Sequence, residues 1–209
     1  MTDLTGKKIA FLVAEDGVEQ VELTTPWEAV KAAGATPVLV APKSGQIQAR
    51  NHLDRGDKFG VDKSLDQADA FEFDALMLPG GVANPDRLRL IPKAVSFTKA
   101  FFVQGKPVAA ICHAPWTLIE AEVTKGRTLT SWPSLRTDLT NSGASWVDQE
   151  VHVSDGPNTP NILVTSRKPA DLTAFCDAMI TAFATEPKDT PAGVDVRRSK
   201  TGAPSSSPT

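Results

Sequence analysis

"GKPVAAICHAPWTLIEA", residues 105–121, is the stretch that decides the fold, because it places a buried strand, a turn and a helix in direct succession. Residues 107–111 are almost entirely apolar, as in a strand buried on both faces. Cys112 and His113 follow at once, and Pro115 suits the first turn of a helix that continues to residue 123. The stretch therefore predicts a strand–turn–helix unit with a cysteine at the turn.

Further strands and helices are predicted on both sides of this unit. We expect strands at residues 8–14, 36–41, 73–78 and 161–166, and helices at 92–104 and 168–184. We also expect a helix within 19–33 that begins around Pro26, a hairpin or long loop within 42–72, and a helix near 134–142 between short strands at 129–132 and 145–153. Such alternation predicts a mainly parallel sheet with helices on both faces.

Composition limits the class of protein. The 209 residues suit one domain, predicted over 1–186, followed by a Pro- and Ser-rich extension at 187–209. The net charge of −3 gives no basic surface for nucleic acid and no polybasic patch for a membrane. Two cysteines and a short first apolar run predict a cytoplasmic protein without a disulfide framework, signal peptide or membrane span.

Cys112 is the candidate nucleophile. A tight strand-to-helix turn needs small residues two positions before and after it, and Ala110 and Ala114 stand there. The positive end of the helix dipole favours a thiolate and should lower the pKa of the thiol, and His113 is a candidate base. The alternative is a buried structural cysteine that packs as a small apolar residue, which is how we interpret Cys176.

Two other predicted strand ends carry candidate polar groups. The N–H of Gly81, after Pro79 and Gly80, is a candidate oxyanion donor; the alternative is a tight turn. Glu19 follows the first strand and is expected to share one proton with the thiolate; the alternative is a solvated acid at a helix start. Asp86 can orient His113, or it can cap a helix.

No cofactor and no metal are expected. His52 and His152 are dispersed and show no metal-ligand spacing, and the chain has neither a phosphate-binding loop nor a dinucleotide fingerprint.

Taken together, these segments resemble the PfpI/DJ-1/ThiJ superfamily, in particular its branch of PfpI-like intracellular proteases and general stress proteins. The resemblance spans residues 8–184. It is carried by EQVELTTPWEAVKAAG (19–34), FDALMLPGG (73–81), GKPVAAICHAPWTLIEA (105–121), GRTLTSWPSLRTDLTNSGASWVDQEV (126–151) and LVTSRKPADLTAF (163–175).

The resemblance implies a flavodoxin-like three-layer sandwich that assembles at least as a dimer. It implies Cys112 as nucleophile, His113 as its partner, Glu19 as the acid that contacts the cysteine, and the N–H groups of Gly81 and His113 as oxyanion donors. It also implies an acidic residue from the neighbouring subunit, which here falls on Asp86. The chain departs from the family pattern in two places: Ala114 replaces a glycine, and the segment after Gly81 is one residue longer and offers Asp in place of Glu.

The leading functional hypothesis is a stress-response cysteine-dependent hydrolase that acts on a peptide or on a glycated, methylglyoxal-type adduct. The alternative from another class is a redox sensor or chaperone whose Cys112 is oxidised to sulfenic or sulfinic acid without turnover. A third hypothesis is an inactive stress-induced scaffold, in which the pKa of Cys112 lies near the ordinary value of about 8.5.

Overall fold

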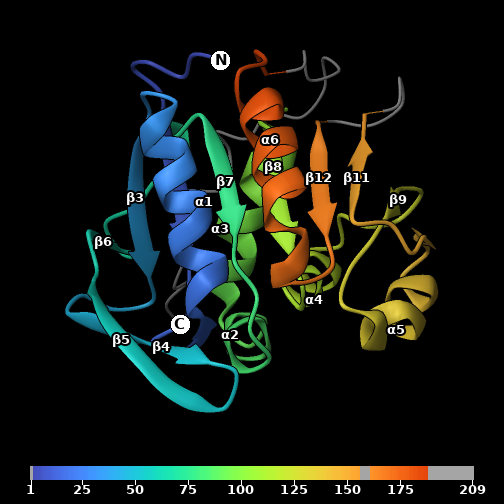
Figure 1. The fold of residues 1–209 in the computed structure, drawn as a ribbon, viewed down its shortest axis with the longest axis horizontal. Helices are drawn as coiled ribbons and strands as arrows, with labels where there is room; N and C mark the ends of the chain where they lie inside the picture. The colour runs from blue at the N-terminus through green and yellow to red at the C-terminus, as the bar shows by residue number, and fades with distance from the viewer. Residues whose placement is uncertain (1, 156–160, 188–209) are drawn as a thin grey trace, which may run out of the picture.

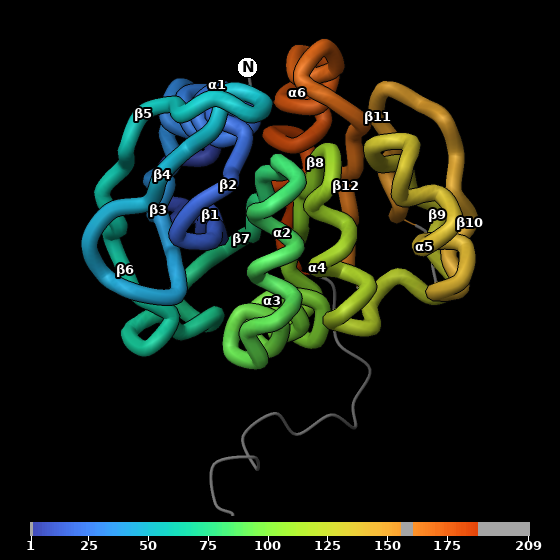
Figure 2. Tube along the Cα trace, turned by 90° about the horizontal axis from the view of Figure 1, so that it is seen from below, coloured from blue at the N-terminus to red at the C-terminus, as the bar shows by residue number. Residues whose placement is uncertain are grey.

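The structure is a computed structural model that describes residues 2–155 and 161–187. All but one residue of the extension predicted at 187–209 lie outside this range, so the extension stays a prediction. The described residues form three layers, with a central sheet between two layers of helices (Figures 1 and 2). The predicted flavodoxin-like α/β sandwich is confirmed.

The central sheet has seven strands within the described residues, and all neighbouring pairs except one are parallel. Only β11 runs antiparallel to its neighbour. In spatial order the strands are β11 (Val151–Ser154), β12 (Leu163–Ser166), β8 (Val108–Ile111), β7 (Ala75–Leu78), β1 (Lys8–Leu12), β3 (Thr36–Ala41) and β6 (Lys63–Ser64).

Helices cover both faces of this sheet because its strands are apolar on both sides. In β1, Ile9 and Phe11 face one core cluster while Ala10 and Leu12 face the other. The first face carries α1 (Gln20–Ala32) and α6 (Leu172–Phe183), which lie side by side in Figure 1. The second face carries α2 (Ala83–Leu88), α3 (Pro92–Val103), α4 (Pro115–Glu120) and α5 (Arg136–Asn141).

Two smaller sheets flank the carboxyl ends of the central strands. One contains β2 (Asp16–Glu19) and the hairpin formed by β4 (Gln46–Asn51) and β5 (Asp54–Gly60), which is the hairpin predicted within 42–72. The other pairs β9 (Thr128–Leu129) with β10 (Ser145–Trp146) on either side of α5. Short 3₁₀ turns lie at η1 (Ala70–Glu72), η2 (Pro133–Leu135) and η3 (Pro169–Asp171).

Two details of the predicted elements are wrong. The helix α1 begins at Gln20 and not around Pro26, which lies buried inside it. A proline removes one backbone hydrogen bond from a helix, and burial of Leu23, Pro26 and Val30 against the sheet outweighs that loss here. The stretch 145–153 is divided between β10 and β11, because β11 leaves α5 to join the edge of the central sheet.

Candidate active site

Cys112 lies at the turn between β8 and α4, in a backbone conformation that L-residues rarely adopt. Its φ is +63°, and Ala110 and Ala114, two positions before and after it, are buried. The N–H of Cys112 donates to the carbonyl of Ser166 at 3.0 Å, and its own carbonyl accepts from the N–H of Trp132 at 2.9 Å. A left-handed residue of this kind costs of order 1–3 kcal/mol and persists only where its surroundings hold it, as these two bonds do. The predicted elbow is therefore present.

The paired glycines bring a second strand end to within contact of Cys112. The N–H of Gly80 donates to Oε2 of Glu22 at 3.0 Å. A Cβ at Gly80 would lie 2.6 Å from Cβ of Cys112, and Gly81 has a φ of +81° and no room for a Cβ against Gly17. Only glycine lets the backbone approach this closely. The backbone N–H groups of Gly81 and His113 act as donors toward Sγ of Cys112. Donors this close to the sulfur can also stabilise a negative oxygen on a carbon bonded to it.

Glu22, and not Glu19, is the acid that contacts Cys112. The Glu22 side chain is fully buried and lies close enough to Sγ to share a hydrogen with it. Its Oε2 accepts from Gly80, and its Oε1 has no hydrogen-bond partner among the described residues. Glu19 is the last residue of β2, and its Oε2 accepts from the N–H of His52 at 3.0 Å. It is nearly buried, so the interpretation as a solvated acid is also wrong. Because α1 begins at Gln20, its first turn directs Glu22 toward the glycines.

Burial sets the protonation of the pair formed by Cys112 and Glu22. Burial raises the pKa of Glu22 to about 8, so this carboxyl holds a proton at neutral pH. Burial first, and then the neighbouring Glu22, raise the pKa of Cys112 above its ordinary value, although the N–H groups of Gly81 and His113 act in the opposite direction. The expectation that the helix end lowers the pKa of Cys112 is therefore wrong, since loss of water outweighs the dipole. The expectation of one shared proton is also wrong at neutral pH, because Glu22 and the thiol of Cys112 are then both protonated.

His113 contacts the sulfur although the two residues are adjacent in the chain. Its Nδ1 lies 3.2 Å from Sγ of Cys112. The ring stacks on Trp132 with centroids 5.7 Å apart and meets Trp116 at 5.3 Å. Burial lowers the pKa of His113 to about 4, so the imidazole is neutral at physiological pH and can accept a proton. Within the described part of the chain, Nε2 has no hydrogen-bond partner.

Asp86 is exposed on α2 and does not line the cavity that contains Cys112. It lies inside the helix, whose N-cap is Val82, so the alternative interpretation as a cap is wrong. A buried neighbour, Asn84, fastens α2 to the strand ends: its Oδ1 accepts from the N–H of Ala14 at 2.6 Å and its amide donates to the carbonyl of Pro79 at 2.9 Å. The role of Asp86 toward a neighbouring subunit stays a prediction.

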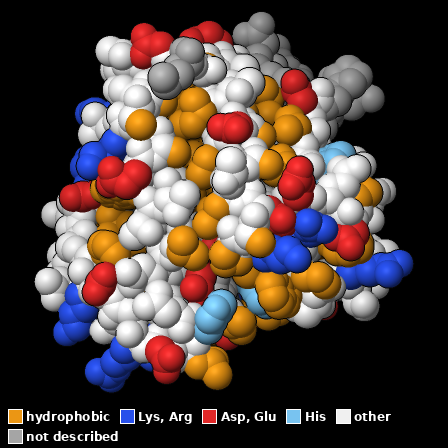
Figure 3. Space-filling view, in the orientation of Figure 1, with side chains coloured by type: hydrophobic (Ala, Val, Ile, Leu, Met, Phe, Trp, Pro, Cys, Tyr) orange, Lys and Arg blue, Asp and Glu red, His pale blue; other side chains and the backbone are white. Residues whose placement is uncertain are grey.

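A cavity of about 370 Å³ opens above Sγ of Cys112. It lies at the carboxyl ends of the parallel strands, where histidine and hydrophobic side chains gather at the lower edge of Figure 3. Beyond the residues already named, its lining includes Asp16, Arg50, Arg87, Leu53 and Pro169. A cavity of this size suits a small ligand or a single side chain.

Glu22, Trp132 and the pair Arg50 and Asp16 were not predicted from the sequence. A correct start for α1 would have marked Glu22, because an acid in the first turn of a helix after a strand points back to the strand ends. The other residues come from segments that only the fold brings together, so no local pattern marks them. Within residues 2–155 and 161–187 no group of three His, Cys, Asp or Glu could hold a metal. No helix of that part of the chain is long and apolar enough to cross a membrane.

Comparison with known proteins gives consistent matches. The sequence pattern of the DJ-1/PfpI family matches residues 7–182. The chain is 44% identical over 168 residues to Deglycase PH1704 of Pyrococcus horikoshii, covering 80% of this chain and 94% of that protein. It is 41% identical over 170 residues to General stress protein 18 of Bacillus subtilis, covering 81% and 94%. The crystal structure of Drosophila melanogaster DJ-1beta superposes with a TM-score of 0.73 at 26% identity, covering 85% of this chain and 90% of that one.

Proposed function

The chain belongs to the DJ-1/PfpI family, and we propose on that basis that it is a stress-response hydrolase that uses Cys112 as its nucleophile. The observation that carries the proposal is the position of Cys112 at φ +63°, with Sγ 3.2 Å from the neutral imidazole of His113 and open to a 370 Å³ cavity. The substrate is a carbonyl compound: a glycated, methylglyoxal-type adduct, or a peptide. The name of the Pyrococcus relative favours the adduct.

The reaction begins at the sulfur. Sγ attacks the carbonyl carbon while its proton passes to Nδ1 of His113, which is neutral and in contact with it. The charge that develops on the carbonyl oxygen is stabilised by the N–H groups of Gly81 and His113. Protonated Glu22 donates to the sulfur and adds no second negative charge beside it.

On a peptide, His113 then returns the proton to the leaving amine, and the acyl fragment remains on the sulfur as a thioester. On a methylglyoxal adduct, the amine leaves the carbinol carbon with this proton, and that carbon bonds to the sulfur as a hemithioacetal. His113 then moves the remaining proton of that carbon to the adjacent ketone carbon, which gives a lactoyl thioester by an internal redox change that needs no external oxidant. Water attacks this thioester with His113 as base, which releases a carboxylic acid and restores the thiol. The rings of Trp132 and Trp116 hold the imidazole in place and keep it neutral by excluding water.

Turnover of defined substrates tests this proposal. Purified protein is incubated with methylglyoxal-modified Nα-acetyl-arginine and, separately, with a fluorogenic peptide, and release of the free product is followed. We expect turnover of the adduct by the wild type and none by Cys112→Ala, with circular dichroism showing that the variant folds. Equal turnover by the two proteins would refute a cysteine mechanism.

The raised pKa of Cys112 bears on the redox alternative. Oxidation by peroxide proceeds through the thiolate, so a buried thiol held protonated reacts slowly. Turnover also needs the sulfur deprotonated, and His113, in contact with it, can accept that proton as a bound carbonyl is attacked. With the deglycase name of the Pyrococcus relative, we favour turnover over sensing. Mass spectrometry after mild peroxide treatment separates the two: selective addition of one or two oxygens to Cys112, in a protein that turns over neither substrate, would favour the sensor.

Asp86 belongs to the proposal as a residue that completes the site of a neighbouring subunit in a homo-oligomer of at least two chains. The free Nε2 of His113 and the exposure of Asp86 support it. Mixed oligomers test it, because Cys112→Ala and Asp86→Ala subunits, each inactive alone, should regain activity when exchanged into one oligomer. An Asp86→Ala protein of full activity would contradict this assignment.

We also propose a cytoplasmic location, in line with two cysteines that are both free. Fractionation of the source cells with an antibody to the protein tests it, and recovery from an extracytoplasmic fraction would contradict it.

A further inference from the structure

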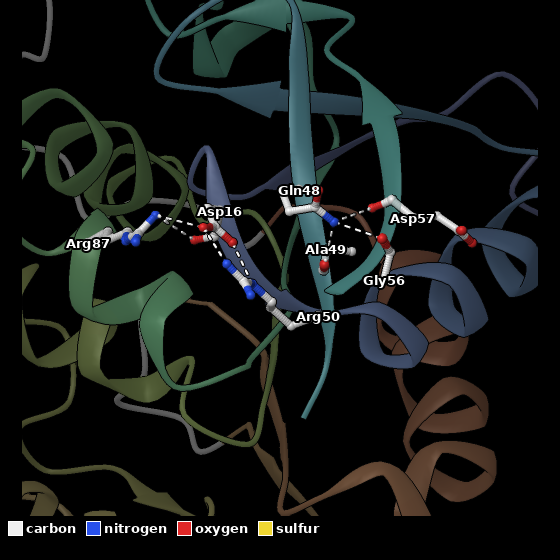
Figure 4. A network of polar contacts seen from close by, with 7 residues as sticks. All are labelled: Asp16, Gln48, Ala49, Arg50, Gly56, Asp57 and Arg87. Atoms are coloured by element: carbon white, nitrogen blue, oxygen red, sulfur yellow. Dashed lines mark hydrogen bonds and ion pairs between the residues drawn. The ribbon is translucent and has the colours of Figure 1, made fainter. Parts of the chain in front are cut away.

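Three segments distant in the sequence meet at Asp16, on the rim of the cavity that contains Cys112. Asp16 comes from β2, Arg50 from β4 and Arg87 from α2 (Figure 4). Arg50 donates to both carboxylate oxygens of Asp16, each at 2.8 Å, in a bidentate pair. Arg87 is held more loosely, with Nη1 3.6 Å from the carboxylate and 3.4 Å from the carbonyl of Asp16.

This cluster has more positive than negative charge. Hydrogen bonds from Arg50 lower the pKa of Asp16, so its carboxylate is ionised, and it balances only one of two guanidinium groups. Arg55 on β5 adds a third positive charge close enough to act on Asp16. Two further carboxyl groups line the cavity: Oε2 of Glu19 accepts from the N–H of His52, and Glu22 is protonated at neutral pH.

Both arginines line the cavity and keep free donors. Arg50 uses Nε and Nη2 on Asp16, so Nη1 has no partner among the described residues, and the side chain of Arg87 is half exposed. The hairpin that carries Arg50 is braced by Gln48, whose amide donates to the carbonyls of Gly56 at 2.7 Å and Ala49 at 2.9 Å (Figure 4). A guanidinium held in this way is pre-organised for the planar oxygens of a carboxylate or phosphate.

We propose that Arg50 and Arg87 form a subsite for an anionic group, a carboxylate or a phosphate, on the substrate whose carbonyl carbon meets Cys112. This inference rests on the proposed function and narrows it to carbonyl compounds that carry an oxyanion. Because Cys112, His113 and both arginines line one cavity of about 370 Å³, the anionic group and the reacting carbon belong to the same small molecule or the same terminal residue.

Matched substrates test the subsite. The methylglyoxal adduct of Nα-acetyl-arginine carries a carboxylate, and the adduct of Nα-acetyl-argininamide does not. We expect the ratio of their kcat/KM values to favour the acid by about tenfold, the usual effect of one charge-assisted hydrogen bond. Arg87→Gln and Arg50→Gln should each bring this ratio close to one. Lys58→Gln is the control, since it removes one charge from the same hairpin outside the cavity lining and should leave the ratio unchanged.

A wild-type ratio of one, or a ratio that Lys58→Gln lowers as much as Arg87→Gln does, would overturn the subsite. A second pair, the methylglyoxal adducts of GMP and of guanosine, distinguishes the two kinds of anion. If only the GMP adduct is preferred over its uncharged partner, the subsite binds phosphate. If only the Nα-acetyl-arginine adduct is preferred over the amide, the subsite binds carboxylate.

Affinity measurements on a protein that cannot react show whether the anion subsite exists, independently of whether the wild type is a hydrolase. Calorimetry of the unreactive Cys112→Ala protein measures the affinity for Nα-acetyl-arginine and its amide without turnover. Tighter binding of the acid, lost in the double variant with Arg87→Gln, supports the subsite even where the wild type hydrolyses neither adduct. Equal affinities for the acid and the amide count against it.

Discussion

The two cysteines of this protein share burial and differ in everything else that matters for reactivity. Cys112 is 6% exposed and Cys176 is 8% exposed, and both are free. Burial raises the pKa of both thiols, that of Cys176 to about 11. Cys176, however, lies in the middle of α6 among core residues, whereas Cys112 has a left-handed backbone and contacts Glu22 and His113. Reactivity in this fold therefore depends on backbone geometry and proton partners, and exposure does not identify the nucleophile.

The sharpest test removes each sulfur in turn. Cys112→Ala should lower kcat/KM by roughly 10³-fold or more, because no other group can form the covalent intermediate. Cys176→Ala should keep kcat/KM within about twofold and lose about 1 kcal/mol of stability from the small cavity it leaves. Steady-state kinetics and urea unfolding measure both effects. Loss of activity in Cys176→Ala without unfolding would break the distinction.

The next largest effect on activity is expected when a side chain is added at Gly80, which follows β7 and packs directly against Cys112. In Gly80→Ala the new methyl group would lie 2.6 Å from Cβ of Cys112 and 2.5 Å from Oε2 of Glu22, so the elbow must shift. We expect a loss of about 1–3 kcal/mol in the free energy of unfolding and a fall of roughly 10²-fold in kcat. Gly60→Ala is the control, since a Cβ there meets nothing within 4 Å and should change stability by less than about 0.5 kcal/mol. Equal behaviour of the two variants would contradict this assignment.

The proton on Glu22 should appear in the pH profile. Activity is expected to rise above pH 4 as His113 becomes neutral and to fall above pH 8 as Glu22 ionises and its charge opposes the thiolate. Glu22→Gln cannot ionise, so its profile should lose the alkaline limb, at about a tenfold lower plateau. Glu19→Gln should keep that limb. The kcat/KM profile from pH 3.5 to 10 decides between the two acids.

The smallest effect on activity is expected when the indole ring of Trp132, which stacks on His113, is removed. Trp132→Ala admits water to the imidazole, which raises the pKa of His113 from about 4 toward the ordinary 6.5. The acid limb of the profile should then move up by about one pH unit, with a change of only a few fold in activity at pH 8. An acid limb that stays in place would mean that Trp132 does not control the water around His113.

The sequence predicts the layers well and the reacting partners less well, for a physical reason. Strands such as β1 and β8 are marked by continuous apolar runs, and the turn at Cys112 by small residues and a proline. The predicted start of α1 and the choice of Glu19 as the acid beside Cys112 are wrong for the same reason. A helix that began at Pro26 would leave Glu22 outside it, whereas α1 begins at Gln20 and carries Glu22 in its first turn. Which of two acids faces a cysteine depends on helix phase, and burial against the sheet sets that phase.

The long-range contacts lie beyond what local sequence patterns can predict. The pair of Arg50 with Asp16 and the stacking of Trp132 on His113 join segments that meet only in the folded chain. No spacing rule marks them, because their members have no fixed separation along the sequence.

The buried carboxyl of Glu22 makes the reactive centre a source of instability at alkaline pH. In the unfolded chain this acid titrates near 4.5, and in the folded chain near 8. Between these values folding must bind a proton that the unfolded chain has released, so the stability contributed below pH 4.5 is lost progressively up to pH 8. Replacing the acid by Gln removes this penalty, and the less active protein should then be the more resistant one in alkali. The wild-type protein is thus less stable in alkali because of the same residue that serves catalysis. Selection for variants that are more stable at high pH would therefore favour variants of lower activity.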